Sequence, residues 1–297
     1  MQAIINHSMN KTLVGIFSGL AAASIWGGMY VVSKVVLNVI PPFTLLSLRL
    51  VLGILSLGIV IVLRPKANIK TSEAWQIFLV GFVGYGVSLG FQFVGTKLST
   101  ASNGALVTSA TPAFILIFAP FLLAEKTTTR RIIALIISTL GVIAVIDPRN
   151  AELSPNLFWG NISLLAAALT WALYSVLVRK VTQTIDVVTS TAIMLAGGLP
   201  SGFLLSAWEI KTQGMGMITP GIIGGILFLG IISTAIAMFL WNYAFAKLPA
   251  AVASLTFFAQ PVVGSLLGWM FLKESITPLF LFGGVLIAIG LVISSTE

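Results

Sequence analysis

The chain of 297 residues contains no cysteine and a single histidine, His7. Disulfides, thiol nucleophiles and zinc sites built from cysteines or several histidines are therefore excluded. Charge is also scarce, because Asp, Glu, Lys and Arg make up 8% of the residues, whereas soluble domains carry about 25%. So few charged groups cannot cover a folded surface with polar side chains, and we expect the outer surface to face lipid.

Recognisable motifs for cofactors and catalysis are missing as well. No glycine is followed by the Lys-Ser/Thr of a phosphate-binding loop, so any transport is predicted to be secondary and not ATP-driven. The Asp-rich metal motifs of membrane prenyl or phospholipid transferases are absent, which makes an intramembrane enzyme the weaker alternative. We expect no enzymatic activity, no cofactor and no metal. The net charge of +8 comes from scattered Lys and Arg instead of one basic patch, which argues against nucleic-acid binding.

Long apolar stretches dominate the sequence, which is 58% hydrophobic with a mean hydropathy of +1.07. A helix needs about 20 apolar residues to cross a bilayer. The first stretch continues well past its alanine run, so a cleaved signal peptide is not expected. The predicted fold is an all-α membrane protein whose connections are too short for a soluble domain. The ten predicted spans are 12–38, 42–63, 73–95, 101–123, 130–147, 158–178, 186–207, 220–245, 250–272 and 278–296.

Several landmarks of residues 12–147 recur in the same order in residues 158–296. Each segment is therefore predicted to be one five-helix repeat. Because five spans per repeat is an odd number, the two repeats must lie in opposite orientations in the membrane. The matching pairs are Trp26 and Trp171, Tyr30 and Tyr174, Pro112 and Pro261, Glu125 and Glu274, and Gly141 and Gly290.

The distribution of basic residues predicts how the chain is oriented. Lys and Arg resist translocation and accumulate on the cytoplasmic side of a membrane. With the N-terminus inside, ten of the sixteen Lys and Arg residues fall on the cytoplasmic side. Both termini are therefore predicted to be cytoplasmic, in a multi-pass protein of the cell inner membrane. The ten residues are Lys11, Arg64, Lys66, Lys70, Lys126, Arg130, Arg131, Arg179, Lys180 and Lys247.

The paired landmarks resemble the EamA family of the drug/metabolite transporter superfamily. Each half has a first helix of small residues and Trp, and the remaining landmarks are Pro112, Glu125 and Gly141, then Pro261, Glu274 and Gly290. The resemblance covers residues 12–296. It implies a ten-helix secondary transporter, built as two inverted five-helix repeats around a central cavity, that exports amino acids or related metabolites by alternating access.

Aromatic and polar side chains within the spans are the candidate substrate contacts. Trp26 and Tyr30 are four residues apart and Trp171 and Tyr174 are three apart, so each pair shares a helix face. Such faces bind apolar rings and cations, with an interfacial belt as the alternative. The polar members suit amino and carboxyl groups, or else bond to neighbouring helices. The predicted substrate-binding residues are Trp26, Tyr30, Tyr85, Ser88, Gln92, Asn103, Thr108, Trp171, Tyr174, Asn242 and Gln260.

Two prolines and one arginine are further candidates. Pro112 and Pro261 are predicted to break the fourth and ninth helices beside the pathway, although a packing kink is the alternative. Arg49 lies seven residues into the second span, where arginine costs up to about 2.5–3.5 kcal/mol. It is a possible substrate or gate contact that would anchor a carboxylate, or else it snorkels to the interface. The second half has Ile193 or Met194 at the equivalent place, so this role is asymmetric.

None of the eight acidic residues lies deep inside a predicted span. Small four-helix multidrug carriers rely on a carboxylate in the first helix, and its absence here leaves proton coupling unsupported. The predicted function is export of amino acids, aromatic or other hydrophobic ones. Efflux of organic cations is the alternative, which the aromatic residues favour. The expected partners are a small-molecule substrate and membrane lipid. The oligomeric state is open, and a monomer is compatible with the sequence.

Overall fold

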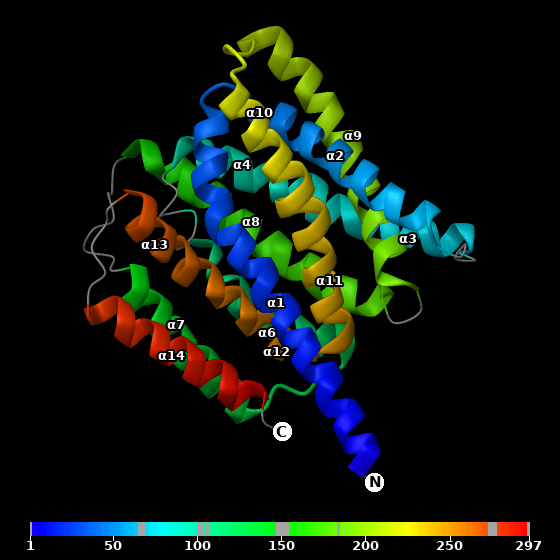
Figure 1. Ribbon diagram of the computed structural model, residues 1–297, viewed down its shortest axis with the longest axis vertical. Helices are drawn as coiled ribbons and strands as arrows, with labels where there is room; N and C mark the ends of the chain where they lie inside the picture. The colour runs from blue at the N-terminus through cyan, green and yellow to red at the C-terminus, as the bar shows by residue number, and fades with distance from the viewer. Residues whose placement is uncertain are drawn as a thin grey trace.

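The computed structural model describes residues 2–64, 69–99, 104, 107–146, 155–182, 185–272 and 278–295, which form helices and no strand (Figure 1). Six helical segments are long and apolar enough to cross a membrane. They are Thr12–Leu37, Pro42–Val62, Thr71–Leu98, Phe158–Val181, Val187–Gln213 and Pro220–Lys247. Shorter apolar helices cover Thr111–Leu123, Ala250–Gly264 and Leu281–Ser294. The prediction of an all-α, multi-pass membrane protein is confirmed at this level.

Turn and cap residues set the helix ends. Proline occupies the first turn of α2, α6 and α10, where its missing N–H is not needed. Asp186 caps α9 by accepting a hydrogen bond from Thr189 N at 2.9 Å. The elements are α1 (Gln2–Leu37), α2 (Pro42–Val62), α3 (Thr71–Gly81), η1 (Phe82–Ser88), α4 (Leu89–Leu98), α6 (Thr111–Leu123), α7 (Thr129–Ile146), α8 (Pro155–Val181), α9 (Val187–Gln213), α10 (Pro220–Leu227), η3 (Phe228–Ile236), α11 (Ala237–Lys247), α12 (Ala250–Leu255), η4 (Thr256–Phe258), α13 (Ala259–Leu272) and α14 (Pro278–Ser295).

Two π-helical segments interrupt long helices in the middle of the bundle. η1 separates α3 from α4, and η3 separates α10 from α11. At the end of each, a backbone N–H bonds the carbonyl five residues earlier, from Leu89 to Gly84 and from Ala237 to Ile232. Such wide turns are rare and occur frequently at functional sites. They also rotate the following side chains relative to a regular α-helix.

Helices from the two parts of the sequence interleave. α1 packs against α11 and α13, whereas α8 packs against α4 and α6. α2 packs along α9, and α7 pairs with α14 at the lower left edge of the bundle (Figure 1). A Cβ atom at Gly81 would lie 1.9 Å from Met194 O, and one at Gly197 would lie 2.0 Å from Phe78 O. The backbones of α3 and α9 therefore touch, as small residues allow in membrane proteins.

The two ends of α9 are tied to the two ends of α2, which runs antiparallel to it. Glu209 near the end of α9 is buried and accepts hydrogen bonds from Phe43 N and Thr44 N at 2.9 Å each. These bonds satisfy the first N–H groups of α2, a role that the position of Glu209 near a predicted span end does not reveal. At the other end, Arg64 pairs with Asp186 at 3.6 Å.

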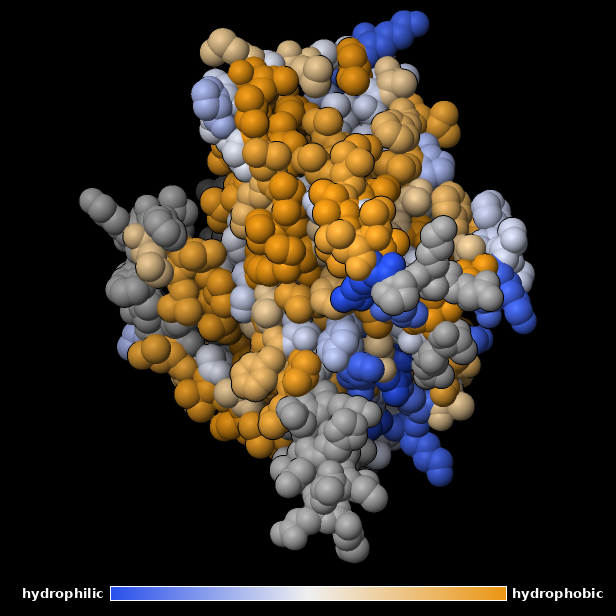
Figure 2. All heavy atoms as spheres, turned by 45° about the vertical axis from the view of Figure 1, so that its right-hand side comes forward, coloured by the Kyte–Doolittle hydropathy of each residue, from blue (hydrophilic) through white to orange (hydrophobic). Residues whose placement is uncertain are grey.

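The outer surface is predominantly apolar. Large exposed side chains such as Phe121, Leu204 and Val62 are more than two-thirds exposed. Figure 2 shows a broad apolar face, with hydrophilic residues gathered mainly toward the lower right of the view. The start of α1 and the end of α14 both lie toward the bottom of Figure 1. A lipid-facing surface of this kind agrees with the low charge of the chain.

Candidate functional site

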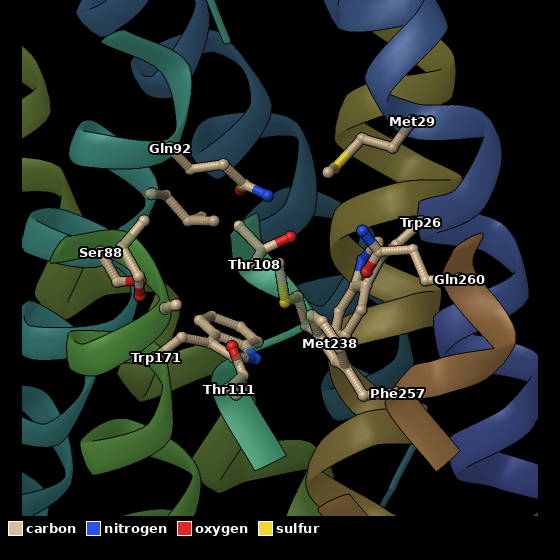
Figure 3. A pocket seen from close by; sticks show the side chains of 13 residues that line it. Trp26, Met29, Ser88, Gln92, Thr108, Thr111, Trp171, Met238, Phe257 and Gln260 are labelled. Atoms are coloured by element: carbon tan, nitrogen blue, oxygen red, sulfur yellow. The ribbon is translucent and has the colours of Figure 1, made fainter. Parts of the chain in front are cut away.

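A small internal cavity of about 30 Å³ lies where α1, α4, α6, α8, α11 and α13 meet (Figure 3). The indole rings of Trp26 from α1 and Trp171 from α8 meet edge-on at its wall, with centroids 5.5 Å apart. Helices distant in sequence thus contribute to one site. Six of the predicted substrate-binding residues line this cavity: Trp26, Ser88, Gln92, Thr108, Trp171 and Gln260.

The cavity is too small for a metabolite in this structure. A volume of about 30 Å³ holds one or two water molecules, whereas pockets for small molecules measure about 300–1,000 Å³. In Figure 3 the side chains of Gln92 and Met29 face each other across the upper part of the cavity, and Trp171 and Phe257 approach from below. Entry of a metabolite therefore requires the surrounding helices to separate.

Small residues bring the walls of the cavity together. A Cβ atom at Gly27 would lie 2.8 Å from Gln260 O and 2.9 Å from Gly264 N, so α1 and α13 touch along their backbones. This contact positions Gln260 beside Trp26 (Figure 3). On α8, Ala168 lines the cavity without filling it. The local sequence thus explains why the site is narrow and why these side chains meet.

Two buried polar atoms of the cavity lining, Trp171 Nε1 and Thr111 Oγ1, have no hydrogen-bond partner in the part of the chain that the structure describes. A third, Gln260 Nε2, has no hydrogen bond of normal geometry there, and the Gln260 side chain interacts with the Tyr30 hydroxyl. The three side chains are at most 7% exposed. A buried polar atom without a partner costs about 1–3 kcal/mol, so native structures rarely leave several together unless water or a ligand satisfies them. The cavity can therefore receive a small polar group.

Tyr30 lies behind the cavity wall and orients two of its residues. Its hydroxyl is 2.9 Å from Thr108 Oγ1 and accepts a hydrogen bond from Gln92 Nε2, also at 2.9 Å. Thr108 donates its own proton to Gly104 O at 2.6 Å, so the Tyr30 hydroxyl donates to Thr108. This chain holds Thr108 and Gln92 against the cavity, and Tyr30 itself is fully engaged.

Tyr85, Tyr174 and Asn242 form a separate buried cluster. Tyr174 donates to Asn242 Oδ1 at 2.7 Å, and Asn242 Nδ2 donates to the Tyr85 hydroxyl at 3.1 Å and to Thr191 Oγ1 at 3.0 Å. The two tyrosine hydroxyls also bond each other. The Tyr174 ring lies 4.8 Å from that of Trp171, so the cluster supports this tryptophan from behind. The wide turn of η1 separates Tyr85 from the face that carries Ser88 and Gln92.

Arg49 is completely buried beside the cavity. Its Nε donates to Thr234 Oγ1 at 2.7 Å, whereas its other contacts are weak: 3.4 Å to Ser233 O and 3.8 Å to Met29 Sδ. The guanidinium also lies 5.1 Å from the centre of the Phe93 ring. No carboxylate pairs with it among the residues that the structure describes. Full burial rules out the snorkelling alternative.

The remaining candidates lie elsewhere or outside the described residues. Pro112 follows a turn at residues 109–110 and begins α6, and Pro261 follows the 3₁₀ turn η4 near the start of α13. Both prolines thus come just after an interruption of the helix, and neither lines the cavity. Asn103 and Glu274 lie outside the described residues.

The site prediction omits several residues that line the cavity, among them Met29, Met238 and Phe257. Met29 and Met238 carry no sequence signal that separates them from other apolar residues of a span. Phe257 has one, because the spacing that aligns Pro261 with Pro112 also aligns Phe257 with Thr108. No group of three or more His, Asp or Glu that could hold a metal occurs within the described ranges.

Comparisons with known proteins agree with this architecture. The sequence profile of the EamA-like transporter family matches residues 13–146 and again residues 158–296. The uncharacterized transporter YoaV of Bacillus subtilis is 24% identical over 284 residues, which is 95% of this chain and 96% of that protein. A "Probable amino-acid metabolite efflux pump" of Salmonella typhimurium is 28% identical, over 94% of this chain and 93% of that protein. One crystal structure, 20% identical, has a TM-score of 0.77 and covers 94% of this chain and 96% of its own, which shows a shared fold.

Proposed function

The protein belongs to the EamA-like transporter family and is a multi-pass membrane transporter of small metabolites, and we propose that it exports amino acids through the cavity between Trp26 and Trp171. One observation carries this proposal. Residues with buried polar groups that lack a hydrogen bond of normal geometry line a small cavity beside two tryptophans, so the site combines an apolar wall with hydrogen-bonding groups. A hydrophobic amino acid presents the same combination. The amino-acid metabolite efflux pump of Salmonella, 28% identical, supports this substrate class.

We further propose that the chain is a ten-helix inverted repeat. Equivalent interactions that occur twice support this arrangement. Tyr30 on α1 bonds Gln92 on α4 at 2.9 Å, and Tyr174 on α8 bonds Asn242 on α11 at 2.7 Å. The first helix of each half packs against the third and fourth segments of the other half. π-helical segments interrupt the third helix of both halves. The central site would then lie at the repeat interface, as in other secondary transporters.

A cationic residue at the end of α1 binds the end of α4, within the first repeat. Lys34 Nζ donates to the carbonyls of Thr96 and Lys97 at 3.0 Å each, and also to Ser99 O at 2.5 Å. These carbonyls end α4, where a positive charge is favourable. Lys34 thus fastens the end of α1 to the end of α4. We assign this end to the outside of the cell.

Arg179 makes the equivalent contacts at the opposite end. Its guanidinium donates to Phe245 O at 3.0 Å and to Leu248 O, which end α11, and it pairs with Glu125 at 2.5 Å. Glu125 in turn accepts a hydrogen bond from Ala250 N at 3.0 Å. An open surface pocket of about 300 Å³ lies beside this ion pair. In alternating access, the contacts of Lys34 and Arg179 would break in turn, with this pocket as the cytoplasmic entrance.

The orientation follows from the same two ends. The end that carries Arg179 also holds Arg64 and the start of α1, and it is the end with the greater share of basic residues. Basic residues accumulate on the cytoplasmic side. We therefore propose an inner-membrane protein with both termini in the cytoplasm, which single-cysteine labelling at exposed positions on each side tests.

Counterflow in proteoliposomes tests the function. Purified protein is reconstituted in vesicles preloaded with unlabelled phenylalanine, leucine or threonine, without a pH gradient, and the matching labelled compound is supplied outside. Transient accumulation of labelled amino acid is the expected result. Trp171→Ala should abolish it, whereas Trp75→Ala, on the exposed face of α3, should not. Exchange of a quaternary ammonium dye but of no amino acid would make the protein a cation carrier and would refute the proposal.

A further inference from the structure

The charge of Arg49 has no counter-ion in the described structure. Arginine inside a bilayer normally faces a cavity and pairs with an acid, because its cost there is about 2.5–3.5 kcal/mol even on insertion scales. Here the guanidinium has one strong hydrogen bond, to Thr234, and two long ones, while an aromatic ring covers one face. These contacts compensate the buried charge of Arg49 only in part. Packing within the protein therefore does not by itself account for an arginine at this position.

Met29 lies between this charge and the cavity. Its sulfur is 3.8 Å from the Arg49 guanidinium, and its side chain lines the cavity opposite Gln92 (Figure 3). Methionine is unbranched and flexible, so it can change rotamer at little cost. A rotation of Met29 would expose the guanidinium to the cavity. Only the Met29 side chain therefore separates Arg49 from a solute bound in the cavity.

The groups of the cavity lining that lack a hydrogen bond of normal geometry are mostly donors. Trp171 Nε1 can only donate, Gln260 Nε2 can only donate, and Thr111 Oγ1 can do either. Arg49 lies behind Met29. A ligand with acceptor oxygens and a negative charge would therefore satisfy these donors and compensate the arginine. No Asp or Glu lines the described cavity, so a cationic group would find neutral acceptors and aromatic faces there but no carboxylate to pair with.

We propose that this donor set recognises the carboxylate of the substrate, with Arg49 as the residue that selects an acid over the matching amine or amide. The inference rests on the proposed transport function and names its substrate class. The carboxylate would contact Trp171, Gln260 and, after Met29 rotates, Arg49. The side chain of the substrate would lie against the indole rings. A cationic amine of the same size would meet an uncompensated positive charge and bind more weakly.

Ligand-dependent thermal stabilisation of the purified protein in detergent tests this selectivity without depending on transport. The ligands are phenylalanine, 3-phenylpropionate, phenylalaninamide and phenethylamine, followed by the matching set built on leucine, 4-methylpentanoate, leucinamide and isopentylamine. A ligand that binds the folded protein raises its unfolding temperature, and the rise grows with the logarithm of the ligand concentration divided by its Kd. The acid of at least one set should act at concentrations about 10-fold or more below those of its amide and amine, since hydrogen bonds to charged groups are the stronger ones.

Substitutions assign the effect to Arg49. Arg49→Gln should raise the concentration of acid required by about 10- to 100-fold and remove the preference over the amide, whereas Arg49→Lys should keep most of it. Arg64→Gln removes a charge that is half exposed and serves as the matched control with unchanged selectivity. A wild-type protein that binds no acid of either set, or binds acid and amine equally, overturns the inference. So does Arg49→Gln with unchanged selectivity.

The two proposals fail in different ways. Counterflow of the labelled amino acids is measured on the same preparations. Amino-acid exchange without preference for a carboxylate refutes the role of Arg49 and leaves the transport function intact. Acid-selective binding that depends on Arg49, without any exchange in sealed vesicles, supports the site and refutes transport of these amino acids.

Discussion

Replacing Arg49 by methionine should abolish substrate recognition without destabilising the protein. Methionine is apolar and long enough to occupy much of the same space. Two partners of Arg49 keep other hydrogen bonds after the substitution, whereas Ser233 Oγ loses its 3.4 Å contact. The Thr234 hydroxyl still donates to Leu229 O at 2.6 Å, and Ser233 O still accepts from Trp26 Nε1 at 3.1 Å. The strong hydrogen-bond partner and the carbonyl partner therefore stay bonded, and only a long contact is lost.

The magnitude follows from opposing contributions. The buried arginine costs about 2.5–3.5 kcal/mol on insertion scales. Against this, its hydrogen bond to Thr234 contributes about 1.5–3 kcal/mol and the contact with Phe93 about 0.5–1 kcal/mol. The contributions nearly cancel, and substitutions of buried charges by apolar residues are often neutral or stabilising. We expect Arg49→Met to unfold with a free energy between that of the wild type and about 2 kcal/mol above it.

Equilibrium unfolding followed by tryptophan fluorescence measures this difference, and counterflow on the same preparation measures transport. Arg49→Ala is the matched comparison, because the cavity that it leaves should cost about 2–4 kcal/mol. Loss of transport together with undiminished stability is the predicted pattern for Arg49→Met. A loss of more than about 3 kcal/mol of unfolding free energy would mean that the arginine is required for the stability of the fold. Normal transport by Arg49→Met would refute any role of Arg49 in substrate recognition.

Three further substitutions and one titration probe the remaining contacts. Trp171→Phe removes the indole N–H, which lacks a described partner, together with part of the ring, so ligand affinity should fall at least several-fold in a binding titration. In a protein that carries Ala168→Cys at the cavity wall, Arg179→Gln should raise access of a membrane-impermeant thiol reagent from the cytoplasmic side, because it breaks the 2.5 Å ion pair, and unchanged labelling would contradict the closing role. Gly197→Ala places a Cβ 2.0 Å from a carbonyl of α3 and should cost more than about 2 kcal/mol of unfolding free energy. Partial burial opposes ionisation of Asp186, but hydrogen bonds from the first turn of α9 lower its pKa overall. Its stabilising contribution should be complete above the ordinary pKa of an aspartate and disappear as the pH falls through the folded value, and Asp186→Asn should remove that pH dependence.

Composition and apolar run length are enough to predict an all-α membrane protein, because every backbone group in lipid must be bonded within its own helix. The pairing of Trp26 with Trp171 in the repeat also anticipates residues that share one wall of the cavity. Recurring positions in two halves meet near a central axis if the halves face each other. The sequence therefore points to the correct part of the bundle.

Individual side-chain orientations are harder to predict, because they depend on contacts between helices far apart in sequence. Tyr85 shares an α-helical face with Ser88 and Gln92 only if the helix is regular, and the π-helical segment η1 breaks that assumption. Met29 resembles every other apolar residue of its span until Arg49 is found behind it. The burial of Glu209 depends on the start of α2, more than 160 residues away.

Two-sided access to the cavity is the most direct test of the account. The native chain has no cysteine, so Ala168→Cys introduces a single thiol at the cavity wall. Asn38→Cys and Lys70→Cys, at exposed positions near opposite ends of α2, report the two sides. In sealed vesicles that exchange amino acid, the account predicts that an impermeant thiol reagent reaches residue 168 from either side and that substrate protects it. A protein that exchanges normally while this thiol stays inert from both sides, or reacts without protection by substrate, would contradict passage through the cavity.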